Sequence, residues 1–370
     1  MLSWKFLCDY KKKREIMFDI NFFMNSHELR KQIMAGKKFR TTDEQEDLFL
    51  QLEQYRSKTP VVFNIETTNL CNMRCGFCPR TTLMTRKNER MGLPMFEKVV
   101  DQLAPHSHLL WKRWESFLQH EYNLYPNEMS QDHFFFYIIP RVLTLHGFGD
   151  PLLDKDIAQK VKLCSERGIP TYFSCNPHNV TLAKARELFD NGLNYIKFSV
   201  DSIDDTPIRG RKDKFSDNLD KIEALVEMKN EKDEYNNLTI VVTMIKLDNR
   251  NSEQWHKFEN RFKDMGVYVY LKDQDQVWHD GSKMNNQSID WNQFCCSPWY
   301  SMTVKSNGDC VSCQEDYNNQ IVFGNANDKN LLDIWNNKMY NSFRMRHVTS
   351  SAAFACRRKC DKRTVGEFVR

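Results

Sequence analysis

From about residue 61 onward, short runs of β-branched and aromatic residues alternate with longer stretches that have apolar residues at helical spacing. Such runs predict strands, and the spacing i, i+3, i+4 predicts helices. The predicted strands cover residues 61–67, 141–146, 170–175, 194–200, 238–245 and 267–271. The predicted helices lie near 95–104, 154–167, 181–190, 215–230 and 252–264. This alternation predicts an α/β fold with a parallel sheet.

Capping residues support these boundaries. Thr181 and Asn251 are suited to be helix N-caps, and Gly168, Gly192 and Gly266 stand where helices are expected to end. In parallel α/β folds the chemistry takes place on the loops that follow the carboxyl ends of the strands. Motifs on those loops are therefore the candidates for function.

Composition excludes several classes of protein. With 28% charged residues and a net charge of +4, neither disorder nor a strongly basic nucleic-acid binder is indicated. The apolar run at 134–139 is too short to span a bilayer, and the basic residues at 11–14 follow the apolar start, the reverse of a secretory signal. We therefore expect a cytoplasmic protein, in which the 12 cysteines bind metals or do redox chemistry rather than form disulfides.

Three cysteines follow the first predicted strand. Cys71, Cys75 and Cys78 have the spacing C-x3-C-x2-C. Three thiolates on a short loop can hold three irons of a cubane cluster and leave the fourth iron open to a small ligand, unlike a closed tetrahedral zinc site. The alternatives are a zinc site with one distant ligand and a chance cluster of thiols.

This segment resembles the cluster-binding loop of radical S-adenosylmethionine (radical SAM) enzymes. The resemblance implies a partial (β/α)6 TIM-like barrel in which Cys71, Cys75 and Cys78 hold a [4Fe-4S] cluster. It also implies that the amino and carboxylate groups of SAM chelate the fourth iron, and that reductive cleavage of SAM releases methionine and a 5′-deoxyadenosyl radical. Phe77 occupies the position that commonly lies near the adenine.

The loop after the second strand reads HGFGDPLL at 146–153. A dinucleotide fingerprint would need a third glycine where Leu152 stands, so this is not a Rossmann motif. The loop is similar to the Gly-Glu-Pro loop of radical SAM enzymes, whose carboxylate receives the ammonium group of SAM. Gly149 and Asp150 take those positions, although Asp150 is shorter by one methylene. The alternative is a glycine-lined structural turn.

Further SAM contacts are implied by weaker similarities. Asn176 stands where many relatives have an asparagine near the ribose or methionine of SAM. Ser199 and Asp201 share one face of the fourth strand and are expected to point into the barrel. Arg209 resembles a downstream arginine that binds the SAM carboxylate, and a solvated loop arginine is the alternative.

A second set of cysteines lies between residues 295 and 360. With the motifs CSPW at 296–299, GN at 324–325 and LLDIW at 331–335, this region closely resembles the SPASM or twitch extension of radical SAM proteins. The resemblance implies that Cys296, Cys313, Cys356 and Cys360 enclose one auxiliary [4Fe-4S] cluster suited to electron transfer. The alternatives are structural zinc, Cys310 in place of Cys313, and Cys295 or Cys310 as a hydrogen-atom donor.

We predict three parts: an N-terminal helical extension (1–60), the barrel (61–272) and the SPASM/twitch domain (273–370). The barrel contains an insert at about 105–140 with nine aromatic residues, which we expect to pack or make a subunit contact at the mouth opposite the SAM loops, or to cover that mouth. The basic segments 11–14 and 37–40 are either solvated helix faces or a surface for an acidic electron donor of the flavodoxin or ferredoxin type.

The expected reaction is hydrogen-atom abstraction from an unactivated carbon. Among proteins with a single auxiliary cluster, enzymes that act on aminocyclitols and amino sugars are prominent, so the resemblance favours a carbohydrate-like small molecule and its dehydrogenation, epimerisation or dehydration. The first alternative is a maturase of a ribosomally made peptide or a protein side chain. The second is a zinc-bearing interaction protein that does not turn over SAM.

Overall fold

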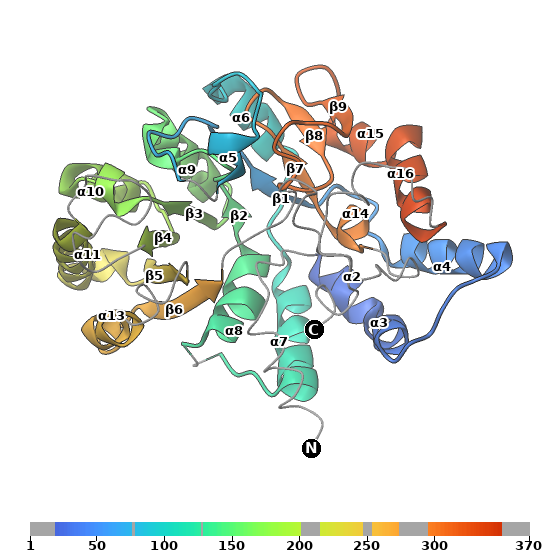
Figure 1. Ribbon diagram of the computed structural model, residues 1–370, viewed down its shortest axis with the longest axis horizontal. Helices are drawn as coiled ribbons and strands as arrows, with labels where there is room; N and C mark the ends of the chain where they lie inside the picture. The colour runs from blue at the N-terminus through green and yellow to red at the C-terminus, as the bar shows by residue number, and fades with distance from the viewer. Residues whose placement is uncertain are drawn as a thin grey trace.

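The computed structural model describes residues 19–75, 78–126, 129–200, 215–246, 254–273 and 295–349, and these contain one nine-stranded sheet (Figure 1). The strand order is β6-β5-β4-β3-β2-β1-β7-β8-β9. The six predicted strands are all present, as β1 (Val62–Ile65), β2 (Leu143–Thr144), β3 (Thr171–Cys175), β4 (Tyr195–Val200), β5 (Thr239–Lys246) and β6 (Tyr268–Asp273). They pair in parallel from β1 to β6, which confirms the predicted α/β fold.

The predicted helices also form, and they cover the outer face of the sheet (Figure 1). They are α6 (Leu93–Val100), α9 (Ile157–Glu166), α10 (Leu182–Asp190), α11 (Phe215–Asn230) and α13 (Trp255–Phe262). Short turns α5 (Pro79–Thr82), η3 (Pro151–Leu153), η4 (Pro177–Asn179) and η5 (Asp233–Tyr235) lie in the connections. Thr181 caps α10 by accepting a hydrogen bond from the Lys184 amide, as predicted, whereas Asn251 lies outside the described residues.

The sheet separates two cores. On β4, Ile196 and Phe198 pack into the core under the outer helices, whereas Tyr195 contacts the core on the inner face. Because side chains alternate along a strand, Lys197 and Ser199 also point to the inner face. The inner face is therefore lined by polar groups toward the carboxyl ends of the strands and by aromatic groups toward their amino ends.

The aromatic insert fills the inner face at the amino ends of the strands. It forms α7 (His108–Tyr122), α8 (Gln131–His133), η1 (Phe134–Ile138) and η2 (Ile139–Arg141). The Phe134 ring lies 5.7 Å from that of Tyr172 and 5.9 Å from those of Tyr268 and Tyr270. The insert thus packs against the end of the barrel opposite the cysteine loop, one of the placements expected from the sequence.

Three N-terminal helices extend this inner core. They are α2 (Ile20–Asn25), α3 (His27–Met34) and α4 (Thr42–Tyr55). The Phe23 ring meets the Trp114 ring edge-on at 5.5 Å. A cavity of about 540 Å³ opens beside these helices, lined by residues that include Asp19, Val62 and His106. This cavity lies at the amino ends of β1 and β2, away from the cysteine loop.

The C-terminal part continues the same sheet. It contains α14 (Ser297–Tyr300), β7 (Met302–Val304), β8 (Asp309–Val311), β9 (Val322–Asn325), α15 (Leu331–Trp335) and α16 (Lys338–Val348). β7 pairs in parallel with β1, and β8 pairs antiparallel with both β7 and β9. Trp335 Nε1 donates a hydrogen bond to the Ser57 carbonyl at 2.8 Å, which ties α15 to the segment before β1.

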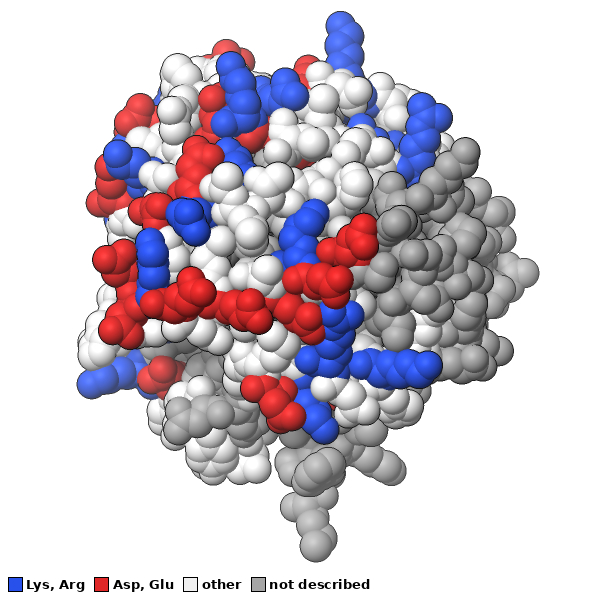
Figure 2. All heavy atoms as spheres, turned by 90° about the vertical axis from the view of Figure 1, so that its left-hand side faces the viewer, with Lys and Arg blue, Asp and Glu red and all other residues white. Residues whose placement is uncertain are grey.

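The outer face of α10, α11 and α13 carries charges of both signs, with a row of acidic side chains across it (Figure 2). Arg261 pairs with Asp220 and Glu223, each at 2.5 Å, and Lys184 pairs with Glu187 at 2.9 Å. Mixed charge of this kind is typical of a solvated face and does not offer the basic stripe that nucleic acids need. In the described ranges, none of the helices has the length and apolar character needed to cross a membrane.

Candidate functional site

The cysteine loop begins just after the carboxyl end of β1. Cys71, Cys75 and Cys78 are half-buried, and the Cys78 amide donates to the Cys75 carbonyl at 3.0 Å. The Met73 amide donates to the Cys71 sulfur at 3.4 Å. Burial raises the pKa of the Cys71 thiol, and the nearby carboxylate of Asp150 raises it further. A cation bound at these sulfurs would stabilise their thiolate forms.

Two glycines let the loop after β2 lie directly against this segment. A Cβ at Gly147 would be 2.5 Å from a Glu66 carboxylate oxygen, and one at Gly149 would be 2.2 Å from the Thr68 carbonyl oxygen. The Asp150 amide then donates to the Leu70 carbonyl at 2.7 Å. Gly149 therefore allows the close approach of two backbones, and Gly147 leaves room for the Glu66 side chain.

Asp150 is buried and anchors the neighbouring loop. One carboxylate oxygen accepts from the Leu152 amide at 3.0 Å, and the other accepts from the Asn176 amide at 3.1 Å and from Asn179 Nδ2 at 2.7 Å. Asn179 also pairs with Asn72 in the cysteine loop, with amide-to-amide distances of 2.7 and 3.0 Å. Asp150 thus holds the loops after β2 and β3 against the cysteine loop.

Of the other predicted SAM contacts, the structure describes two and leaves three outside the described residues. The Asn176 side-chain oxygen accepts from the His178 amide at 2.8 Å, so this side chain shapes the turn at the end of β3. Ser199 lies on the inner face of β4, in the direction expected. Phe77, Asp201 and Arg209 lie outside the described residues.

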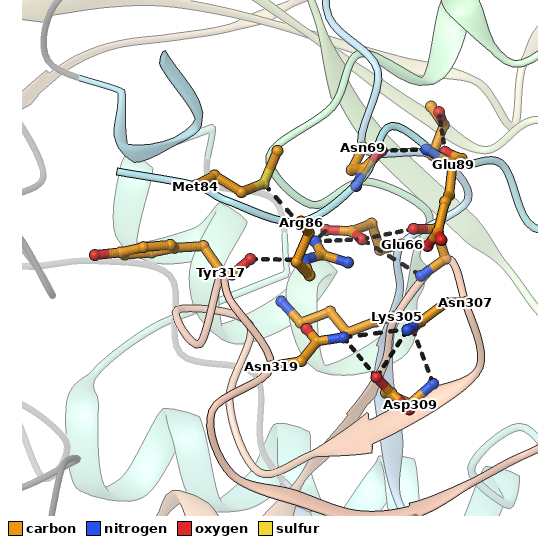
Figure 3. A network of polar contacts seen from close by, with 12 residues as sticks. Glu66, Asn69, Met84, Arg86, Glu89, Lys305, Asn307, Asp309, Tyr317 and Asn319 are labelled. Carbon is orange, nitrogen blue, oxygen red and sulfur yellow. Dashed lines mark hydrogen bonds and ion pairs between the residues drawn. The ribbon is translucent and has the colours of Figure 1, made fainter. Parts of the chain in front are cut away.

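A buried ionic network that the motif search missed joins this site to the C-terminal part. Figure 3 shows the Arg86 side chain directed toward Glu66, with Lys305 beside them. Arg86 Nη2 donates to both Glu66 oxygens at 2.7 and 2.9 Å, and the Ser306 hydroxyl donates to Glu66 at 3.0 Å. Arg86 Nε donates to the Tyr317 carbonyl at 2.6 Å, and Lys305 Nζ to the Gln314 carbonyl at 2.7 Å.

The charges in this network stabilise one another. Burial alone would raise the pKa of Glu66, but the charges of Lys305 and Arg86, together with hydrogen bonds from Arg86 and the Ser306 amide, hold it below its usual value. Burial lowers the pKa of Lys305, and the Glu66 carboxylate opposes that effect. The one sequence signal was an acidic residue at the end of an otherwise uncharged strand, 61–67.

The structure places part of the second set of cysteines. Cys296 stands at the start of α14 and Cys313 follows β8. Both interact electrostatically with the buried Tyr300 hydroxyl, as does Cys295. Cys310 instead packs into the outer core, where burial raises its pKa to about 12. Cys296 and Cys313 thus lie near one buried hydroxyl, whereas the Cys310 thiol is part of the outer core.

The cysteines of the two sites suit iron-sulfur clusters better than single metal ions. Cys356 and Cys360 lie outside the described residues. Within the described ranges, no three side chains of His, Cys, Asp or Glu come close enough to hold one metal ion. The three half-buried thiols of the first loop, one of which accepts an amide hydrogen bond, fit a [4Fe-4S] cluster, whose sulfur ligands are cysteine thiolates.

Comparison with protein families gives two matches. Residues 133–259 match the model of the radical SAM superfamily, and residues 295–361 match SPASM, described as an iron-sulfur cluster-binding domain. These domains bind [4Fe-4S] clusters and use SAM. The first match begins after the cysteine loop, so that loop is assigned by its spacing and its geometry.

Individual relatives are distant. The S-adenosyl-L-methionine-dependent 2-deoxy-scyllo-inosamine dehydrogenase of Niallia circulans is 22% identical over 289 residues, which cover 76% of this chain and 85% of that protein. The structure of BtrN with AdoMet and 2-DOIA is 17% identical, covers 81% of this chain and 93% of that one, and gives a TM-score of 0.47.

The structure of SuiB from Streptococcus suis bound to the precursor peptide SuiA is 16% identical, covers 87% of this chain and 79% of that one, and gives a TM-score of 0.50. At this identity the likeness concerns the fold alone. The family matches, together with the thiol loop after β1, are decisive: the chain belongs to the radical SAM superfamily of enzymes and carries a C-terminal SPASM iron-sulfur domain.

Proposed function

We propose that this enzyme cleaves SAM reductively and abstracts a hydrogen atom from a carbohydrate-like small molecule, an aminocyclitol or amino sugar, leading to dehydrogenation, epimerisation or dehydration. The observation that carries the radical chemistry is the loop of three half-buried cysteines packed against the Asp150 loop. The substrate class is supported by the dehydrogenase relative, whose likeness extends over 76% of this chain.

In this proposal Cys71, Cys75 and Cys78 hold the first cluster, which supplies the electron that splits SAM. Asp150, fixed by the Asn176 amide and by Asn179, accepts the ammonium group of SAM. Phe134 and its aromatic neighbours pack against the opposite end of the inner face and exclude water from that side. Exclusion of water protects a reactive radical from side reactions.

The auxiliary cluster is assigned to Cys296, Cys313, Cys356 and Cys360. Its chemistry would be to accept the electron that a substrate radical must lose when an alcohol becomes a ketone. The position of Cys296 and Cys313 around Tyr300, and the packing of Cys310 into the outer core, support this ligand set. A closed four-cysteine cluster suits electron transfer better than substrate binding.

We also propose a cytoplasmic location and an electron donor of the flavodoxin or ferredoxin type. A reducing compartment keeps cysteines in the thiol form that the proposed clusters need. The exposed basic residues Lys37, Lys38 and Arg40 lie between α3 and α4, which Figure 1 shows well away from α5 and the cysteine loop. The donor is therefore expected to dock elsewhere, nearer the cysteines.

The deciding experiment uses anaerobically reconstituted protein, dithionite and SAM with a panel of aminocyclitols and amino sugars that includes 2-deoxy-scyllo-inosamine. We expect about eight irons per chain and substrate-dependent release of 5′-deoxyadenosine. Deuterium at the reacting carbon should appear in the 5′-deoxyadenosine. The variant Cys71→Ala/Cys75→Ala/Cys78→Ala should give none.

The products separate the alternatives. Loss of two hydrogens marks dehydrogenation, unchanged mass with a new configuration marks epimerisation, and loss of water marks dehydration. Release of 5′-deoxyadenosine with a peptide substrate only would replace the small-molecule proposal by the maturase alternative. Zinc in place of iron, with no 5′-deoxyadenosine under any condition, would overturn the radical chemistry.

A further inference from the structure

The N-terminal helices bring a buried positive charge to the auxiliary site. Arg30 on α3 is 1% exposed, and its guanidinium lies 3.5 Å above the Phe23 ring. Its Nε donates to the Ser26 hydroxyl at 3.1 Å and its Nη2 to the Phe23 carbonyl at 2.7 Å. Its Nη1 has no hydrogen-bond partner.

No carboxylate among the described residues forms an ion pair with this guanidinium. Its neighbours are the Tyr122 hydroxyl, which also forms a hydrogen bond with it, the Tyr300 hydroxyl and the Cys296 thiol, and each of them interacts with it electrostatically. Packing contacts also bring the N-terminal helices close to Tyr300. The Asp19 amide at the start of α2 donates to the Tyr300 carbonyl at 3.1 Å, and the Phe22 and Tyr300 rings lie 6.0 Å apart. Arg30 and Cys296 thus belong to one buried cluster of side chains.

A buried cation without a counter-charge is costly, so such groups are normally paired or placed near an anionic group. Other buried cations near the C-terminal cysteines have acidic partners: Lys305 has Glu66, and Arg344 lies 3.8 Å from Glu53. Of the neighbours of Arg30, Cys296 is the one that becomes anionic when it binds iron as a thiolate.

We infer that Arg30 is the counter-charge of the auxiliary cluster and raises its reduction potential, which makes the N-terminal extension part of the cluster site. This rests on the proposed assignment of Cys296 as a ligand. A cluster with four thiolates is anionic and gains one more negative charge on reduction, so a nearby positive charge favours the reduced form. Arg30 would in this way prepare the cluster to accept an electron.

The test is a redox titration, followed by electron spin resonance, of full-length protein with Cys71, Cys75 and Cys78 replaced by alanine, so that the auxiliary cluster alone is observed. In this background we expect Arg30→Met to lower the equilibrium constant for reduction about tenfold, a shift of about 59 mV to lower potential for one electron. Arg30→Lys should keep most of the original value. Lys31→Met is the matched control, because it removes a charge from the same helix at a side chain that is 47% exposed, and it should have no effect.

An unchanged potential in a cluster-loaded Arg30→Met protein would overturn the inference, as would equal loss of the cluster in Arg30→Met and Arg30→Lys. Loss of the cluster in Arg30→Met alone, with circular dichroism unchanged, would support a required charge. Cys296→Ala separates this inference from the ligand assignment. If that variant keeps the auxiliary spectrum, Cys296 is not a ligand and the inference fails together with that assignment, whereas 5′-deoxyadenosine release tests the rest of the proposed function.

Discussion

Gly149 leaves room for the backbone that leads into the cysteine loop. The Cβ of Gly149→Ala would lie 2.2 Å from the Thr68 carbonyl oxygen and 2.8 Å from the Asn69 Cα. Backbone atoms cannot move aside cheaply, so we expect this variant to lose about 1–3 kcal/mol of unfolding free energy and to bind less iron at the first loop. Urea denaturation and iron content after anaerobic reconstitution measure both effects.

Gly92→Ala is the matched control, since its Cβ would meet only Pro94 Cδ at 3.8 Å, an ordinary contact. If the two variants bound iron equally well, the close approach at Gly149 would not position the cysteines.

Glu66 makes a second residue-level prediction because it lies between two buried cations. Glu66→Gln would leave Arg86 and Lys305 without their shared partner, and we expect it to cost about 3–5 kcal/mol near neutral pH. The folded-state pKa of Glu66 is lowered, so its stabilising effect is complete above the unfolded value of about 4.3 and fades as the pH falls through the lower folded value. Urea denaturation from pH 7 down to strongly acidic pH should show the gap between variant and parent protein closing in acid.

Glu28→Gln serves as the control, because Glu28 pairs with Lys31 at the surface and is 75% exposed. We expect little change at any pH. A Glu66→Gln deficit that stays constant down to strongly acidic pH would mean that the carboxylate charge is not what stabilises the network.

Sequence reasoning found site residues whose spacing is local and missed those whose partners are remote. Cys71, Cys75 and Cys78 share one loop, so their spacing and the family resemblance that it carries predict a cluster there. Glu66 and Lys305 are 239 positions apart, and although Glu66 stands at the end of an otherwise uncharged strand, nothing local indicates that the two residues meet. Burial of a charge depends on which segments meet in space, and that information is spread over the whole chain.

At the scale of elements, the aromatic insert closes the amino end of the inner face and is held by contacts among its own side chains. Trp114 is fully buried, its ring stacks on Phe117 at 5.4 Å, and its Nε1 donates to the Phe136 carbonyl at 2.7 Å. We expect Trp114→Ala to cost about 3–5 kcal/mol, because α2 would lose its contact through Phe23 and the insert would lose its contact through Phe136. Leu109→Ala on the same helix, at a side chain 72% exposed, should change the urea midpoint little. Equal urea midpoints for the two variants would mean that the buried face of α7 does not stabilise the fold.

Element boundaries show where local patterns stop being sufficient. The strand predicted at 141–146 is limited to Leu143–Thr144, because Pro140 starts a 3-10 turn in which the Val142 amide donates to the Ile139 carbonyl. The long strands β4 and β5 match their predictions closely, since both are buried on two faces and lack proline. Hydrophobic periodicity thus predicted the alternating strands and helices. It did not predict the structure of the insert, which depends on the three-dimensional contacts of its aromatic rings.

At the scale of the whole molecule, the barrel and the C-terminal strands share one sheet. β7 pairs with β1 from Val62 to Ile65, and Ser306 just beyond it holds the Glu66 carboxylate. A chain that ends after residue 273 would make β1 an edge strand and would remove Ser306, Lys305 and the Tyr317 carbonyl from the Glu66–Arg86 pair. The segment that carries Cys71, Cys75 and Cys78 would then lose the contacts that hold it in place.

We therefore expect the chain truncated after residue 273 to lose iron binding at Cys71, Cys75 and Cys78 even though it retains all three thiols. Iron content and the spin-resonance change on adding SAM measure this directly. The control is the full-length chain with Cys296, Cys313, Cys356 and Cys360 replaced by alanine, which removes the auxiliary ligands but keeps β7 and Ser306. Iron bound equally well by the truncated and control chains would show that the barrel folds its cluster loop alone. Loss in the truncated chain only would mean that the shared sheet, rather than the second cluster, holds the first site in place.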